Sequence, residues 1–283
     1  MNRLQRVYVL TAVFLTAGCV VGERHEATIQ RQWPASAIRT IEVVGVDGSL
    51  NVEAGSANEV ALVAHVRSIG IVPNQRKENQ GYFDTELNGD TLRIGQQRER
   101  IRVGFPFVMR SKVSVDYELR VPSTVALDLK MVNGRVMTRG VDGACEVTTV
   151  NGPIDIETAG NNELNARTVN GSVHAKFLHD FRGARLKTVN GGVHALLPPT
   201  ASFTCDLSQV NGDFEASFPL SIHSNPGSRR VSGMVNGGQF ELQITTVNGD
   251  VEVQHLQPPA VPQVPAVPPP PAAAQPAPPA PHA

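Results

Sequence analysis

The tripeptide Val-Asn-Gly occurs seven times between residues 132 and 249, and this recurrence limits the possible folds more than any other feature of the chain. Counted from one Asn to the next, the spacings are 18, 19, 20, 21, 25 and 12 residues. A period near twenty residues is typical of architectures in which similar units stack. Because Asn and Gly tolerate positive φ better than other residues, each copy predicts a sharp corner of the backbone. The predicted corners are Asn133 with Gly134, Asn151 with Gly152, Asn170 with Gly171, Asn190 with Gly191, Asn211 with Gly212, Asn236 with Gly237 and Asn248 with Gly249.

Apolar residues alternate with polar ones on both sides of each corner. Positions six and four before Asn170 hold Leu164 and Ala166, and positions three and five after it hold Val173 and Ala175. A period of two excludes a helix and predicts two strands, each with one buried face. A single coil cannot bury that face alone, so successive coils must lie on one another.

The fold predicted from this pattern is all-β: a single-stranded β-solenoid (β-helix) over residues 121–256, with an irregular β-rich N-terminal cap over 36–120. Equivalent Asn residues would lie about 4.8 Å apart, the spacing of neighbouring strands, and their side chains would form a hydrogen-bonded ladder. The same strand-corner-strand pattern extends weakly upstream, to GVDGSLNVEAG at 45–55 and LNGDTLRIG at 87–95.

The two ends of the chain predict export and a tail. Residues 1–18 have two Arg, an apolar run and small residues, as in a signal peptide. The sequence LTAGC resembles the lipobox of bacterial lipoproteins, which implies acylation of Cys19, a lipidated linker over 19–35 and, with Val20 next, an outer-membrane location. The alternative is ordinary cleavage near Ala17. Residues 257–283 hold 12 of the 21 prolines and no charged side chain, which predicts an extended, disordered Pro/Ala-rich tail.

The phrases VDYELRVPSTVALDLKMVNG, TVNGPIDIETAG and TVNGDVEVQ, together with the lipoprotein leader, resemble the bacterial "putative adhesin" β-solenoid family. The resemblance covers about residues 36–256. It implies a β-helical fold and a surface location, and it brings no catalytic residues and no cofactor to carry over.

Cys145 and Cys205 occupy the same position of the repeat, six residues before the corner Asn. Three coils would separate them by about 14 Å at about 4.8 Å per coil, whereas a disulfide needs Cα atoms within about 7 Å. The spacing predicts two separate, buried thiols.

Position four after the corner Asn holds Asp155, His174, His194 and Glu215 in consecutive copies. If the coils stack in order, these side chains form one outward row, and imidazole with carboxylate is a ligand set for zinc. The alternative is a solvated row of cross-strand neighbours. Asp155 and Glu157 are also a candidate carboxylate pair for polysaccharide hydrolysis, but the only Trp, Trp33, lies outside the repeats.

The segment 96–112 combines cations with an apolar tip, and Phe105, Phe107, Arg102 and Arg110 are its candidate partner-binding residues. The alternative is a hairpin whose Phe pair packs on the end of the stack. The 25 Lys and Arg nearly balance the 26 Asp and Glu, which argues against nucleic acid as a partner. The sequence therefore favours a non-enzymatic, lipid-anchored envelope protein, in the outer membrane or periplasm, that serves as a rigid scaffold for adhesion or protein contact; the alternative is an enzyme or divalent-metal module acting on envelope polysaccharide.

Overall fold

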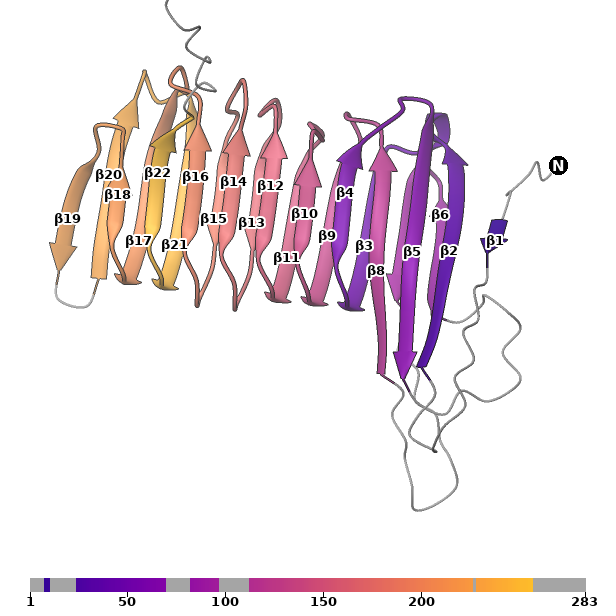
Figure 1. Ribbon diagram of the computed structural model, residues 1–283. Coiled ribbons are helices and arrows are strands. Elements are labelled where there is room, and N and C mark those ends of the chain that lie inside the picture. The colour runs from indigo at the N-terminus through magenta and orange to yellow at the C-terminus, as the bar shows by residue number, and fades with distance from the viewer. Residues whose placement is uncertain (1–7, 11–23, 70–81, 97–111, 226–227, 257–283) are drawn as a thin grey trace, which may run out of the picture.

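The computed structural model describes residues 8–10, 24–69, 82–96, 112–225 and 228–256. The described chain is all-β apart from one turn of 3-10 helix, Ala35–Ala37. Its strands form two large mixed sheets of eleven strands each, which run side by side along the molecule (Figure 1). The fold class predicted from the alternation of apolar residues is therefore confirmed as all-β.

The first sheet, called sheet A, contains in spatial order β1 (Tyr8–Leu10), β2 (Arg24–Pro34), β5 (Glu59–Ile69), β8 (Lys112–Val121), β4 (Leu50–Ala54), β10 (Val136–Arg139), β12 (Ile154–Thr158), β14 (Val173–Phe177), β16 (Val193–Leu197), β22 (Val251–His255) and β18 (Phe214–Ala216). The second, sheet B, contains β19 (Ser221–Asn225), β20 (Ser228–Val235), β17 (Phe203–Asn211), β21 (Phe240–Asn248), β15 (Ala184–Lys187), β13 (Leu164–Arg167), β11 (Cys145–Asn151), β9 (Ala126–Asn133), β3 (Thr40–Asp47), β7 (Thr91–Gln96) and β6 (Phe83–Asn88).

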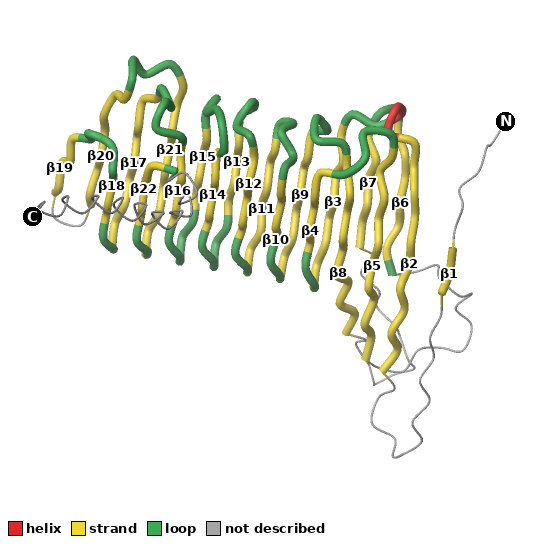
Figure 2. The backbone as a smooth tube through the Cα atoms, turned by 45° about the horizontal axis from the view of Figure 1, so that its top comes forward, coloured by secondary structure: helices red, strands yellow, loops and turns green. Residues whose placement is uncertain are grey.

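The repeating unit is a coil made of one strand of sheet B, an Asn-Gly corner and one strand of sheet A. Neighbouring coils pair in parallel in both sheets, and equivalent residues of the repeat face one another: Leu164 pairs with Cys145 on one side and with Ala184 on the other. The corners form one regular edge of the stack, while the loops that lead to the next coil form the other (Figure 2). In stacking order the coils are β3–β4, β9–β10, β11–β12, β13–β14, β15–β16, β21–β22 and β17–β18.

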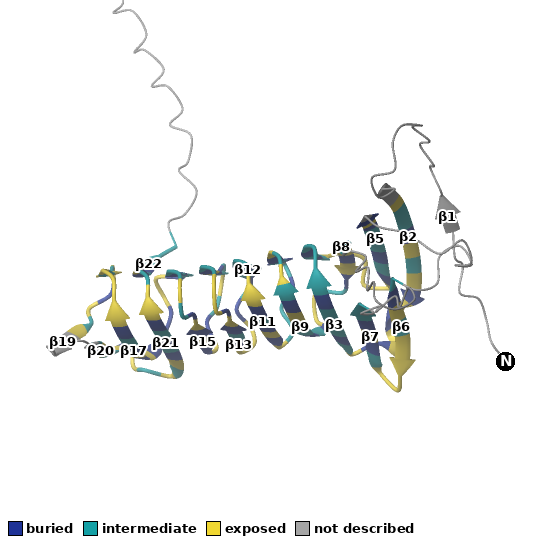
Figure 3. Cartoon of the chain, turned by 90° about the horizontal axis from the view of Figure 1, so that it is seen from below, coloured by how far each residue is buried: buried dark blue, intermediate teal, exposed yellow. Residues whose placement is uncertain are grey.

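Burial follows the period-two pattern along each strand. Strand β12 alternates between buried and half-buried residues, and β15 alternates between buried and exposed ones. The bands of buried and exposed residues across the strands show the same alternation (Figure 3). The buried residues of the two sheets form one continuous core that extends from the N-terminal part to the last coil. Removal of these apolar side chains from water is the main stabilising contribution to the stack.

The order of the last two coils differs from the order of the sequence. Strand β21 pairs with β15 on one side and with β17 on the other, and β22 lies likewise between β16 and β18. The coil formed by the C-terminal strands is therefore inserted between two coils that precede it in the chain. The expectation that each coil stacks on its sequence predecessor is wrong at this place, although it holds from β9 to β16.

Asn236 with Gly237 is not a corner of the stack. These residues join β20, which is antiparallel to β17, to β21, which is parallel to β17 on its other side. The connection passes the start of β17, and the Asn236 amide donates to the carbonyls of Pro199 and Ala201 there. Asn236 has a φ of 50°, so it adopts the positive φ predicted from its residue type. It does so in the connection between β20 and β21 and not in a corner of the stack.

The N-terminal part combines one true coil with antiparallel extensions. Residues 45–55 include the first corner, Asp47 with Gly48, as the upstream pattern predicted. Residues 87–95, by contrast, belong to an antiparallel hairpin of β6 and β7, so this unit is not a coil. Strands β5 and β2 extend sheet A with antiparallel pairing beyond β8. Residues 24–34 of the predicted linker thus form the strand β2.

A row of aromatic rings fills the core near the irregular edge of the last coils. Phe181 packs edge-on against Phe177, with ring centroids 5.0 Å apart, and against Phe203 at 5.7 Å. Phe203 continues to Phe218 at 5.2 Å, and Phe218 contacts His255. Edge-to-face pairs of this kind contribute beyond their buried area. They hold together the loops where the repeat is least regular.

Candidate functional site

The corner asparagines form a ladder of side-chain hydrogen bonds along the regular edge of the stack. The amide of Asn151 donates to Oδ1 of Asn133 across 2.8 Å, and Asn170 donates to Asn151 across the same distance. Every amide in the ladder donates toward the N-terminal end. The donors in spatial order from the C-terminal end are Asn211, Asn248, Asn190, Asn170, Asn151 and Asn133, and the final acceptor is the carboxylate of Asp47, 2.7 Å from Asn133. The predicted ladder is confirmed, except that it skips Asn236 and ends on an aspartate.

The corner glycines are required by close approach of one coil to the next. A Cβ at Gly171 would lie 2.2 Å from the carbonyl oxygen of Gly152, and a Cβ at Gly152 would lie 2.0 Å from that of Gly134. Both glycines have positive φ, 157° and 155°. The amides of the corner glycines other than Gly212, which lies in the outermost coil, also donate to the carbonyl of the neighbouring coil's Asn, as Gly152 does to Asn170. Any side chain here would push adjacent coils apart.

The Thr of the Thr-Val-Asn-Gly motif forms a second, buried ladder that the sequence analysis did not identify. The hydroxyl of Thr168 donates to the carbonyl of Gly152 at 3.1 Å, and Thr188 donates to that of Gly171 at 2.9 Å. Gln209 takes the same position in the outermost coil and donates to the carbonyl of Gly249. The signal was present in the sequence, since Thr recurs two residues before Asn at a position where the period-two pattern predicts burial.

The Val of the motif points outward, on the outer face of sheet B. Val150, Val169, Val210 and Val247 are 36–44 % exposed, and they lie in one column because the corner Asn that follows each of them is bridged in register along the stack. A neighbouring column on the same face holds Arg167 directly opposite Lys187. Both cations are exposed, and in the described part of the chain neither forms an ion pair. Like charges directly opposite on paired strands are destabilising, so this surface is not explained by stability alone.

The outward row of sheet A contains the predicted histidines as cross-strand neighbours. Strand pairing places His174 between Asp155 and His194. The rings of His174 and His194 lie edge to face with centroids 5.9 Å apart. Nδ1 of His174 lies 3.2 Å from Oδ1 of Asp155, whose other oxygen is 3.4 Å from Nε of Arg135.

Glu215, the predicted fourth member of this row, is separated from His194 by the inserted coil. Glu252, not Glu215, is the neighbour of His194, and Glu215 lies one strand further on. Nε2 of His194 is 3.1 Å from Oε2 of Glu252. The described residues contain no group of three or more His, Cys, Asp or Glu side chains that could hold a metal ion.

The candidate carboxylates Asp155 and Glu157 are adjacent outward residues of β12, and each lies beside a cation. Glu157 accepts a hydrogen bond from Lys176 at 3.0 Å, and Asp155 has Arg135 and His174 as neighbours. The residues Phe105, Phe107, Arg102 and Arg110, proposed from the sequence as partner-binding residues, and Cys19 lie outside the described residues.

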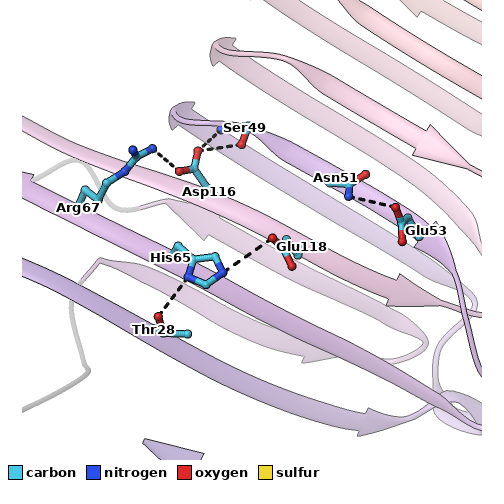
Figure 4. Close-up of polar contacts among 8 residues, drawn as sticks. All are labelled: Thr28, Ser49, Asn51, Glu53, His65, Arg67, Asp116 and Glu118. Carbon is cyan, nitrogen blue, oxygen red and sulfur yellow. Dashed lines mark hydrogen bonds and ion pairs between the residues drawn. The ribbon is translucent and has the colours of Figure 1, made fainter. Parts of the chain in front are cut away.

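A polar network joins the N-terminal strands to the first coil (Figure 4). Asp116 of β8 accepts hydrogen bonds from the backbone amide and the hydroxyl of Ser49, both at 2.8 Å, and it pairs with Arg67 of β5. His65 of β5 lies 3.1 Å from the Thr28 hydroxyl of β2 and 3.8 Å from Glu118. These residues come from segments that are distant in sequence and outside the repeat, so no sequence pattern indicated that they lie close together. Their arrangement anchors the antiparallel strands to the stack.

Cys145 and Cys205 are both free and buried, as predicted. Burial raises the pKa of each thiol to about 12, and Asp206 contributes to the shift at Cys205. Their strands β11 and β17 are four steps apart in sheet B rather than three, so the separation is about 19 Å at about 4.8 Å per strand. These thiols are unreactive core residues and not a redox pair.

Among the described residues, no helix is long and apolar enough to cross a membrane.

The solved structures with a similar shape are distant in sequence. A "putative cell adhesion protein" from Clostridium sporogenes ATCC 15579 is 9 % identical, with 83 % of this chain and 100 % of that chain covered and a TM-score of 0.43. A "putative adhesin" from Bacteroides fragilis NCTC 9343 is 9 % identical, with 81 % and 97 % covered and a TM-score of 0.30. A "putative lipid binding protein" from Parabacteroides distasonis ATCC 8503 is 11 % identical, with 81 % and 97 % covered and a TM-score of 0.35. At such TM-scores, nothing about the function of these proteins transfers to this chain.

No curated protein matches the chain at a significant level. The model of one protein family, described as Toastrack DUF4097, matches residues 127–254. The match covers the coils from β9 to β22, which carry the Asn ladder, the corner glycines and the buried Thr. The repeat region of this chain therefore matches the Toastrack family, in agreement with the adhesin-like resemblance of its Thr-Val-Asn-Gly motifs.

Proposed function

We propose that the protein is a non-enzymatic, lipid-anchored envelope protein whose stack of coils is a β-solenoid scaffold for adhesion or protein contact. The observation that carries the proposal is the uninterrupted pairing of seven coils, in which outward residues recur at every strand on two fixed faces. In such a stack each coil contacts only its neighbours, and the outward positions are free to vary without disturbing the core.

The outer face of sheet B is the proposed contact surface. Its column of exposed Val supplies apolar area, and the adjacent pair Arg167 and Lys187 supplies positive charge that no carboxylate of the described chain neutralises. Complementary charge increases the rate and specificity of association. An envelope component that bears acidic groups fits this surface better than a neutral one.

The contact surface is tested by replacing Arg167 and Lys187 together with Gln and measuring cosedimentation with isolated envelopes at several salt concentrations. The matched control replaces Arg139 and Lys176 of sheet A with Gln, which removes the same charge from the opposite face. The proposal expects salt-sensitive binding that falls by about tenfold in the first variant only, the size expected for loss of about 1.4 kcal/mol. Equal binding by both variants would contradict it.

The lipid anchor is tested separately. In a bacterium that carries out lipoprotein processing, the wild-type chain should incorporate labelled palmitate and fractionate with membranes. A Cys19→Ala variant should lose the label and appear in the soluble fraction, because a lipid attached at Cys19 would be its membrane anchor. Membrane association that survives this substitution would contradict anchoring at Cys19.

A further inference from the structure

We propose that the partner of the outer face of sheet B is a single chain of an acidic polysaccharide, extended along the stack. This inference rests on the contact surface of the proposed function and names the chemistry of its occupant. The carboxylates of the polysaccharide would pair with a straight column of cations on sheet B, and its sugar rings would lie against the neighbouring column of exposed Val residues.

The cation column begins with the outward residues three positions before the corner Asn. Lys187 lies directly opposite Arg167, and Arg230 of the antiparallel strand β20 continues the same line beyond Ser208. In spatial order the column contains Lys130, Thr148, Arg167, Lys187, Thr245, Ser208 and Arg230. From β9 to β20 it extends over about 29 Å, since neighbouring strands are about 4.8 Å apart. Every residue of the column thus offers a ligand either a positive charge or a hydroxyl group.

Most of the cations in this column lack a counter-charge. Lys130 is the exception, since Nζ lies 2.7 Å from Oδ2 of Asp128. Arg167, Lys187 and Arg230 are exposed and form no ion pair with any residue in the described part of the chain. Like charges on directly paired residues are destabilising. The neighbouring Arg167 and Lys187 therefore reduce the stability of the free protein, and a bound anion would offset that loss.

The surroundings of the cation column favour a narrow ligand. The Val column on one side is uncharged, whereas the column on the other side contains the exposed carboxylates of Glu146 and Asp206. Arg185 of that acidic column is already paired with Glu163 and Glu241. A bilayer of acidic lipids, or the broad face of an acidic protein, would meet these carboxylates together with the cations and be repelled by them. A single extended chain can contact the cations and the Val column without covering the acidic column.

A polymer of sugar acids matches the chemistry of both columns. Its carboxylates can form charge-assisted hydrogen bonds with Arg and Lys, and its hydroxyls can bond with those of Thr148, Thr245 and Ser208. The C–H groups of its rings offer apolar area to the Val column. The repeats contain no Trp, so stacking on Trp, which is common for neutral sugars, is not available there. Recognition would therefore depend on charge.

The test is calorimetric titration of the full chain, carrying Cys19→Ala, with size-fractionated oligogalacturonates that are shorter and longer than the cation column. We expect saturable binding that tightens with length and reaches a plateau beyond about 29 Å. The same oligomers with methyl-esterified carboxylates are the neutral control and should not bind. Polyglutamate and phosphatidylglycerol vesicles should bind severalfold more weakly than the longest oligomer, because the peptide lacks sugar rings and the vesicle surface also meets the acidic column.

Substitutions of the unpaired cations locate the bound chain. Arg167→Gln, Lys187→Gln and Arg230→Gln should each weaken binding of the longest oligomer severalfold. Each should also lower the slope of log affinity against log salt by about 0.7–0.9, as for one ionic contact to a nucleic acid. Arg185→Gln, which removes the same charge from the acidic column, should change the affinity less than about twofold, and Thr245→Lys should tighten binding. Far-UV circular dichroism and the unfolding midpoint verify that each variant is folded.

The outcomes separate this inference from the proposed contact surface. If the double substitution of Arg167 and Lys187 reduces envelope binding but no oligogalacturonate binds, the contact surface stands and the polysaccharide is wrong. Tighter binding of polyglutamate or of the vesicles would likewise overturn the choice of ligand. Affinity that is independent of length, unchanged in Arg230→Gln, or reduced equally in Arg185→Gln and Arg167→Gln would overturn the extended path along the column.

Discussion

The side-chain amide of Asn248 donates to Oδ1 of Asn190 across 2.9 Å, although 58 residues separate the two in the chain. Asn248 thereby takes the ladder position that sequence order assigns to Asn211, which donates to Asn248 instead. The ladder is therefore continuous in space but not in sequence, and its integrity depends on the last strands of the described chain.

The first prediction concerns Gly171. Substitution of Gly171 by Ala should lower the free energy of unfolding by about 1 kcal/mol or more, because the added Cβ would lie 2.2 Å from the Gly152 carbonyl oxygen at a φ of 157°. Urea unfolding followed by circular dichroism measures the change. Gly95→Ala is the matched control, since no atom lies within 4 Å of its Cβ position, and it should shift stability by less than about 0.5 kcal/mol. Equal effects at both sites would contradict the close approach of the corners.

The second prediction concerns the direction of the Asn ladder. Asn170→Asp should destabilise the fold by about 1–3 kcal/mol at neutral pH, because the carboxylate removes the donor to Asn151 and faces its oxygen. Asp47→Asn should have a much smaller effect, since Asp47 only accepts in the ladder and an amide oxygen can still accept from Asn133. Thermal unfolding of both variants tests the difference, and a larger loss in Asp47→Asn would reverse the assigned direction.

The third prediction separates satisfied from unsatisfied threonines. Thr168 and Thr149 are both buried, but only Thr168 has a hydrogen-bond partner, the carbonyl of Gly152. Thr168→Val should therefore cost about 1 kcal/mol, whereas Thr149→Val should be neutral or stabilising because it removes an unpaired buried hydroxyl. Chemical denaturation of both variants checks this, and a loss at Thr149 as large as that at Thr168 would indicate a partner for its hydroxyl.

The fourth prediction concerns the thiols. Burial raises the pKa of Cys145 and Cys205 to about 12, whereas an exposed thiol titrates near about 8.5. The unfolded chain thus releases these protons first as pH rises, and stability should fall from about pH 8.5 up to about pH 12. In a Cys19→Ser background, a thiol reagent at pH 8 should label neither residue in the native protein and both in urea. Labelling of native protein at the denatured rate would show that these thiols are accessible.

Much of the fold was predictable because the residues of each repeat copy indicate the local backbone conformation of one corner and its two strands. The spacing of Asn170 and Gly171 indicated corners, and the alternation around them indicated which residues are buried. The position of Glu252 was not predictable, because strand order depends on pairing between distant segments and the motif is the same in every copy. The irregular spacings of 25 and 12 residues around Asn236 were the only local sign of the insertion. No local sequence feature indicated the network of Asp116 and His65, since its residues do not recur at a regular spacing in the chain.

The inserted position of β21 and β22 has a consequence for biogenesis. A ribosome releases residues 198–235 before residues 240–255, yet in the finished stack β17 and β18 pair with β21 and β22 and not with β15 and β16. Strands β17 and β18 can therefore reach their final pairing only after β21 and β22 have been synthesised. A chain arrested before residue 240 should thus lack the native neighbours of β17 and β18, so the native order of the stack is established only when the last two strands are complete.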